Sequence, residues 1–269
     1  MLSGPRVLET GISGGLQPSD VARDYHNFLV KLISGHPGKF VGLGLAHPTE
    51  PSDEMFREME RAIKELGLRG FMVVPRYGKD WLDSPKASPF FELCEELGAV
   101  VFVHSADGCI ASEHMHEHRL IELVGRPNEM TLLAARLIFA GHMERYPKLK
   151  LLLARLGGAI TMYAGRIEQG WQTRHSRSSG IPPWGPDNIE QSFMNSLRRI
   201  HFDTQSFHPP AIRCAVDTVG ADRVLLGSDF PPVPHPLEES IEDVRASGVS
   251  AKNVEKILGT NAKRVFAIS

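Results

Sequence analysis

The chain has 269 residues, of which 42% are hydrophobic, and it is therefore long enough for one large core such as that of a strand-and-helix barrel of about 250 residues. With 30 basic and 32 acidic residues, the formal net charge of -2 gives no overall field that would attract nucleic acid or anionic lipid. Three cysteines without metal-like spacing, an N-terminus without export features and no apolar run of about 18 residues predict a cytoplasmic protein without a membrane span.

Short β-rich runs alternate with helical patterns along the chain. Residues 2–5 resemble the end of a strand, and further strands are predicted at residues 40–46, 70–74, 100–104, 150–155, 200–203 and 224–229. Helices are predicted at residues 19–34, 52–66, 88–98, 130–146, 210–219, 237–246 and 250–265, with a loop at residues 176–188. This alternation indicates a parallel sheet covered by helices.

We therefore expect an α/β fold, a TIM-like (β/α)8 barrel that lacks its first strand and helix. Seven strands are expected, and residues 1–269 are expected to form a single domain. A barrel that lacks a strand keeps two sheet edges with unpaired backbone N–H and C=O groups, so other parts of the chain must cover these edges.

Three predicted strands end in side chains that are suited to chemistry. They are His104, Arg155 and Asp229, and the active sites of such barrels form at the carboxyl ends of the strands. A neutral imidazole and a carboxylate are ordinary ligands for zinc or a similar divalent ion. From position alone, His104 could equally form a hydrogen bond within the core, and Asp229 could cap the turn that follows it.

Several longer motifs are spread along nearly the whole chain. They are GKFVG at residues 38–42, MERAIKELG at 59–67, FVH at 102–104, YPKLK at 146–150, LGGA at 156–159, GR at 165–166 and GADRVLLGSDFP at 220–231. In these motifs the chain resembles the amidohydrolase-related family that contains aminocarboxymuconate-semialdehyde decarboxylase and the resorcylate-type decarboxylases. The resemblance implies a divalent metal, zinc in the first place or manganese, and a small carboxylate substrate.

The resemblance also implies a set of metal ligands. The family holds its metal with a His-x-His pair at the first strand, a histidine at the fifth and an aspartate at the eighth, and His104 and Asp229 match the last two. The pair has no counterpart, because the chain is expected to begin where the second strand of the family would be ending. The family's acid/base histidine at the sixth strand is replaced here by Arg155.

Arg155 and Arg166 have different implied roles. Arginine keeps its proton at the pH where enzymes work, so Arg155 cannot shuttle protons. It could bind a substrate carboxylate bidentately, or pair with Asp229 where a metal would have supplied positive charge. Arg166 matches a family arginine that reaches the active site of a neighbouring subunit and binds a substrate carboxylate, which implies a homodimer. The alternative for Arg166 is a solvated helix arginine.

Two other patterns offer weaker signals. His116 and His118, in a histidine cluster at residues 114–118, have the spacing of the missing pair, but a surface cluster is the preferred interpretation. Ser13 lies in a Gly-x-Ser-x-Gly pattern. A nucleophilic serine of this kind needs a strand before it and a helix directly after it, whereas Gln17 and Pro18 follow here.

The leading hypothesis is a metal-dependent decarboxylase (carboxy-lyase) or hydrolase of a small carboxylated aromatic or unsaturated substrate. In it, His104 and Asp229 hold the metal, Asp229 and Arg155 act in catalysis, and Arg166 binds substrate. The alternative is a non-catalytic, degenerate barrel that binds a small anion or a partner subunit. A third interpretation is that translation begins upstream of Met1, in a segment that carries the missing pair.

Overall fold

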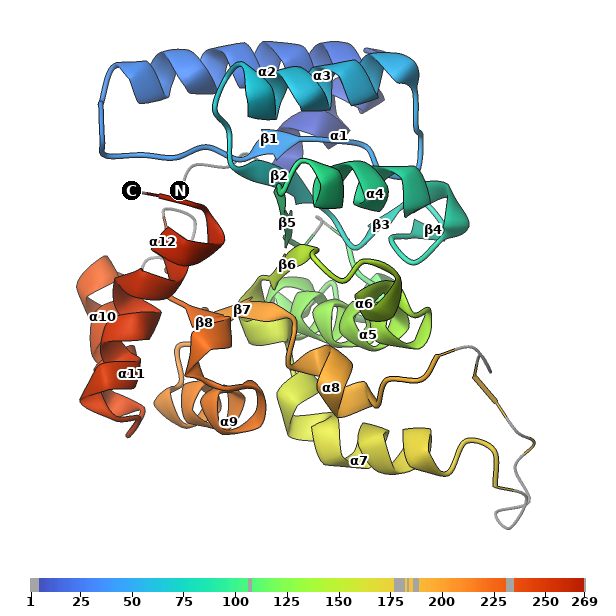
Figure 1. Cartoon of the computed structure of the whole chain (residues 1–269), viewed down its shortest axis with the longest axis vertical. Coiled ribbons are helices and arrows are strands. Elements are labelled where there is room, and N and C mark those ends of the chain that lie inside the picture. Colours follow the sequence, from blue (N-terminus) through green and yellow to red (C-terminus); the bar gives the residue numbers. More distant parts are fainter. Residues whose placement is uncertain are drawn as a thin grey trace.

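Six parallel strands form the central sheet (Figure 1). The computed structural model describes residues 5–105, 108–176, 182, 184–185, 189–230 and 235–268. The strand order within these residues is β1-β2-β5-β6-β7-β8. The bounds are Gly44–Leu45 for β1, Gly70–Val73 for β2, Val100–Val103 for β5, Lys150–Leu153 for β6, His201–Asp203 for β7 and Val224–Leu225 for β8.

Each of these strands coincides with a predicted one, and every neighbouring pair is parallel. The predicted α/β fold is therefore confirmed, and the strand count agrees with a partial barrel. The strand expected at residues 2–5 lies outside the described residues apart from Pro5, where a helix begins. Strand β5 has all its side chains buried, as its unbroken apolar pattern predicts for a strand covered on both faces.

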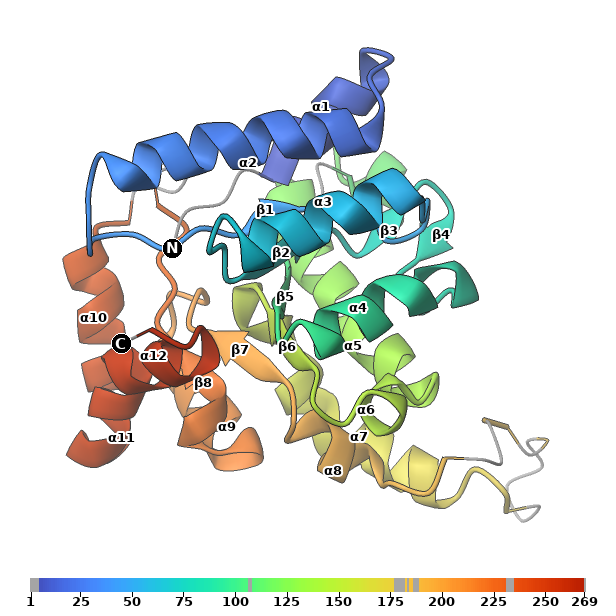
Figure 2. The ribbon, with the colours of Figure 1, turned by 45° about the horizontal axis from the view of Figure 1, so that its top comes forward.

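Helices surround the sheet (Figures 1 and 2). They are α1 (Pro5–Ser13), α2 (Pro18–Ser34), α3 (Asp53–Lys64), α4 (Ser88–Glu96), α5 (Arg126–Phe139), α6 (His142–Arg145), α7 (Ile160–Gln172), α8 (Phe193–Leu197), α9 (Pro209–Val219), α10 (Leu237–Ala246), α11 (Ala251–Glu255) and α12 (Asn261–Val265). A small antiparallel pair, β3 (Arg76–Tyr77) and β4 (Asp80–Trp81), follows β2. None of the described helices has the length and apolar character needed to cross a bilayer.

The helices differ from the prediction in several places. The single helix expected at residues 130–146 is divided into α5 and α6 by Gly141, whose φ of 77° interrupts a right-handed helix. The short helix α8 occupies a segment where the sequence predicts none, as do α1 and α7. Both contain glycine, Gly11 in α1 and Gly165 and Gly170 in α7, which weakens the local helical signal that packing then overrides.

The edge strand β1 is covered by α2 and α3, which lie side by side in both views (Figures 1 and 2). The backbone N–H of Leu45 donates to Nε2 of His26 on α2 at 2.9 Å. Nδ1 of His26 therefore carries the ring proton and donates to Oε1 of Glu58 on α3 at 2.6 Å. The His26 side chain thus pairs with a backbone N–H of β1, which is an edge strand of the described sheet.

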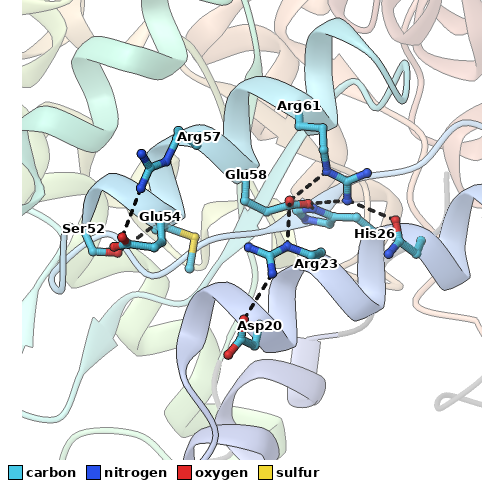
Figure 3. A network of polar contacts seen from close by, with 10 residues as sticks. Asp20, Arg23, His26, Ser52, Glu54, Arg57, Glu58 and Arg61 are labelled. Carbon is cyan, nitrogen blue, oxygen red and sulfur yellow. Dashed lines mark hydrogen bonds and ion pairs between the residues drawn. The ribbon is translucent and has the colours of Figure 1, made fainter.

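Glu58 is held from two sides in this cluster (Figure 3). Both its carboxylate oxygens accept from Arg61 at 2.8 Å, and Nε of Arg23 lies 3.6 Å from Oε2. Burial raises the pKa of Glu58, but hydrogen bonds from His26 and Arg61 outweigh burial and lower it to about 2. This charged clamp, which consists of His26, Glu58, Arg61 and Arg23, therefore links α3 and β1 to α2.

The opposite edge strand, β8, is covered by the C-terminal helices. The backbone N–H of Leu226 donates to the carbonyl of Ile257 at 2.9 Å. The buried amide of Asn261 donates to the carbonyls of Ala221 and Val224 at 2.7 and 2.8 Å. The cover that the sequence requires for both sheet edges is thus provided by α2 and by the segment that leads into α12.

Candidate functional site

Three strands deliver four polar side chains to one cavity. His104 follows β5, Asp203 ends β7, Gln205 lies two residues further on, and Asp229 follows β8. All four line a cavity of about 320 Å³, together with apolar side chains that include Phe102, Leu152 and Leu225. Because the strands are parallel, their carboxyl ends meet at one end of the sheet, and there the sequence predicts the site.

His104 is held as a neutral imidazole. Its Nδ1 lies 3.0 Å from the carbonyl oxygen of Ser105, which can only accept, so Nδ1 carries the proton and Nε2 is left as an acceptor. Burial lowers the pKa of His104, and the positive charge of Arg155 lowers it further. The side chain is therefore ready to accept a hydrogen bond or to ligate a metal, but it carries no proton to give from Nε2.

Arg155 lies in an unusual turn after β6. Arg155 and Leu156 have φ of 56° and 53°, and Gly157 and Gly158 also have positive φ. This left-handed run costs about 1–2 kcal/mol for each residue other than glycine. The turn is held by Asp203, whose Oδ1 accepts from the backbone N–H of Leu156 at 2.9 Å. The protein thus maintains a strained backbone at the position where the guanidinium begins.

The guanidinium of Arg155 points to its neighbours at the site. Nε donates to Oγ of Ser105 at 3.0 Å, and one terminal nitrogen lies 3.8 Å from Oδ2 of Asp229. The side chains of Arg155 and Asp229 are 12% and 14% exposed. Asp229, itself at φ 54°, also accepts from Nε2 of Gln205 at 2.5 Å. The structure therefore brings together His104, Arg155 and Asp229, as their places at strand ends predict.

Asp203 is a pocket residue that the sequence analysis did not single out. Burial raises the pKa of its carboxyl to about 6, although backbone N–H groups of the Arg155 turn oppose this effect. The sequence did contain a signal, because Asp203 is the polar last residue of a predicted apolar strand. Gln205 and Ser105 carried no comparable signal, since each lies in a loop and meets its partner only through the fold.

Arg166 lies apart from this cavity. It is an exposed residue of α7 and lines an apolar groove of about 520 Å³ with Phe139, Tyr163 and Trp184. Ser13 is the last residue of α1, so it has a helix rather than a strand before it and lacks the backbone setting of a nucleophilic serine.

The donor set was compared with what a divalent ion needs. Among the described residues, no group of three or more His, Cys, Asp or Glu side chains is placed to hold a metal ion. His104 and Asp229 supply two donors, and the guanidinium of Arg155 occupies the neighbourhood of Asp229 with a positive charge. His114 and His118 have side chains that are 80% and 82% exposed. The described residues by themselves therefore do not fit a divalent ion.

Comparison with known proteins places the chain among amidohydrolases. The family model described as amidohydrolase matches residues 12–268. A relative in Dictyostelium discoideum, named 2-amino-3-carboxymuconate-6-semialdehyde decarboxylase, is 32% identical over 249 residues, which are 90% of this chain and 65% of that protein. The chain thus spans just under two thirds of this relative's length.

Solved structures show the same fold. 5-Carboxyvanillate decarboxylase LigW from Sphingomonas paucimobilis superposes with a TM-score of 0.84 at 21% identity, covering 100% of this chain and 78% of that one. A dihydroxybenzoic acid decarboxylase from Polaromonas, solved with bound manganese and 2-nitroresorcinol, gives a TM-score of 0.79 at 22% identity, covering 93% and 76%. From its match to the family model over nearly its whole length, this chain belongs to the amidohydrolase family.

Proposed function

We propose that the chain binds a small carboxylated aromatic or unsaturated acid at the carboxyl ends of its strands and acts on it as a carboxy-lyase. The observation that carries the proposal is the meeting of His104 and Asp229 at one cavity wall, with the guanidinium of Arg155 3.8 Å from Asp229. Phe102 and Leu152 give this cavity an apolar wall suited to a ring or an unsaturated chain. Decarboxylation is preferred to hydrolysis because the Dictyostelium relative and both structural neighbours carry the names of decarboxylases.

Zinc and manganese are the ions to test with this site. Manganese is present in the Polaromonas structure, and zinc suits an imidazole and a carboxylate. His104 and Asp229 are the residues of this chain that would hold such an ion. A bound ion would polarise substrate oxygens, but these two donors do not complete a site, and Asp229 is already engaged by Gln205 and Arg155.

The second candidate function is binding of a small anion without turnover, and Arg155 favours it. A guanidinium that holds the carboxylate stabilises the ground state, whereas decarboxylation needs the negative charge to leave that group. Arg155 also cannot donate a proton to carbon, whereas burial raises the pKa of Asp203, a carboxyl of the same pocket, to about 6. For the lyase, by contrast, Asp203 is the residue that would have to supply the proton to carbon.

We further propose that the chain forms a homodimer through the outer face of α7. Met162 and Tyr163 are 69% and 53% exposed there, beside the apolar groove that Arg166 lines. Light scattering of the wild type and of Met162→Asp tests this proposal. We expect a dimer for the wild type and a monomer for the variant, and a monomeric wild type at micromolar concentration would reject it.

An assay of carbon dioxide release separates the two candidate functions. Purified protein is incubated with 2,6-dihydroxybenzoate or with an unsaturated dicarboxylate, with and without added Mn²⁺ or Zn²⁺, and ligand binding is measured in parallel. Release of carbon dioxide that Asp203→Asn abolishes supports the lyase. Binding without release supports the second candidate, and neither binding nor release of any tested acid argues against both.

A further inference from the structure

We propose that Arg155 takes the place of a divalent cation in this pocket, so that the pocket binds a carboxylate without metal. The inference rests on the proposed function, because it specifies how the same cavity holds its ligand. It depends on this chain's own residues, namely on an arginine 3.8 Å from Asp229, which is one of the two side chains that would otherwise face a metal.

The hydrogen bonding of Arg155 is incomplete in a way that suits a carboxylate. Its side chain is only 12% exposed, yet within the described residues the guanidinium makes one hydrogen bond, from Nε to Ser105. The terminal nitrogens make none there, and Asp229 is 3.8 Å away. A buried guanidinium needs partners for its N–H groups, and a carboxylate can accept from two of them at once. The unused donors therefore define the chemistry of the ligand.

The position of this guanidinium is fixed by its surroundings. Ser105 is 4% exposed and orients Nε, while Asp229 lies 3.8 Å from a terminal nitrogen. The turn that carries Arg155 also packs closely against the backbone of α5, because a Cβ at Gly158 would lie 2.0 Å from the carbonyl oxygen of Pro127. A preorganised cation of this kind loses little freedom when an anion binds, which favours affinity.

The same contacts disfavour a divalent cation. Oδ2 of Asp229 already accepts from Gln205 and faces Arg155, so a metal on this oxygen would compete with the amide and lie close to the guanidinium. Like charges at this separation repel, and the low exposure of both side chains limits screening by solvent. The pocket thus already contains the positive charge that a metal would otherwise bring.

Binding of 2,6-dihydroxybenzoate to the full chain, measured by calorimetry in EDTA and again with Mn²⁺, tests the inference. We expect the dissociation constant in the two conditions to agree within about twofold. Arg155→Gln should weaken binding about 10- to 100-fold, the range for losing a charge-assisted hydrogen-bonded contact. Arg57→Gln, which removes an exposed arginine paired with Glu54 on α3, is the matched control and should leave the constant unchanged.

Ser105→Ala keeps the charge and removes only the hydroxyl that orients it, so it covers the case in which Arg155→Gln does not fold. We expect about three- to tenfold weaker binding for this variant. Binding that EDTA abolishes and Mn²⁺ restores would overturn the inference and leave the proposed function standing. The same holds if folded Arg155→Gln and Ser105→Ala both bind as the wild type does. No binding in either condition would instead overturn the proposed function itself.

Discussion

The clamp at the edge of β1 permits a quantitative prediction for Glu58→Gln. Hydrogen bonds from His26 and Arg61 lower the pKa of the Glu58 carboxyl from 4.5 to about 2 in spite of its burial. Each pKa unit corresponds to about 1.4 kcal/mol of preference for the charged form, so the folded state gains about 3 kcal/mol from ionised Glu58. Because glutamine keeps the shape but not the charge, the variant should lose about this free energy of unfolding at pH 7.

The pH dependence of this loss identifies its cause. A carboxyl whose pKa is lower in the folded state stabilises the protein above about pH 4.5, and this contribution disappears as the pH falls towards 2. Urea unfolding of Glu58→Gln and wild type, between pH 7 and the lowest pH at which both remain folded, measures the difference. Glu60→Gln is the control, since Glu60 on the same helix is 43% exposed and pairs with Lys64 at the surface, so a much smaller loss is expected. A loss that equals the control, or one that stays constant down to pH 3, would refute the reasoning.

Three further predictions concern His142, Asn261 and Gly158. Burial lowers the pKa of His142 to about 4, so the stabilising effect of its neutral form, complete above about pH 6.5, should fall by about 3 kcal/mol as the pH drops to 4. His142→Leu should flatten the slope of unfolding free energy against pH in this range, and an unchanged slope would contradict this cause. Asn261→Ala removes the bonds to Val224 on β8 and to Ala221 before it and should cost about 2–3 kcal/mol in urea unfolding, whereas a cost below about 1 kcal/mol would mean that water replaces the amide. Gly158→Ala combines a positive φ of 65° with a clash against Pro127 and should lower stability by about 3 kcal/mol in thermal melts, and a variant as stable as the wild type would show that the turn relaxes.

Local patterns were sufficient for most of the sheet and for several helix ends. The apolar run at Val100–Val103 is buried throughout, and Ser52 accepts from the backbone N–H of Met55 as an N-terminal cap should. Both signals depend on a few consecutive residues, so the sequence displays them directly. The division of the helix expected at residues 130–146 was missed because Gly141 adopts a left-handed conformation that a glycine permits but does not require.

Three residues of the candidate site were predictable, but their contacts were not. His104, Arg155 and Asp229 were visible as polar ends of apolar strands, because parallel strands place their carboxyl ends together whatever the loops do. Between the two roles open to Arg155, the structure shows the guanidinium near Asp229 and bonded to Ser105, with its terminal N–H groups still unused by the described residues. That arrangement depends on the left-handed turn after β6, which the residue types of Arg155 and Leu156 do not predict.

The sequence by itself thus determined the alternation of strands and helices and the three strand ends that meet at the pocket, since both follow from local periodicity and from the parallel sheet. Only the tertiary structure decided how the sheet edges are covered. His26 and Leu45 are 19 residues apart, and Asn261 and Val224 are 37 apart, and no local pattern connects residues so distant. These bonds exist because buried backbone groups must find partners, and the packing of α2 and α12 determines which side chains are near enough to serve.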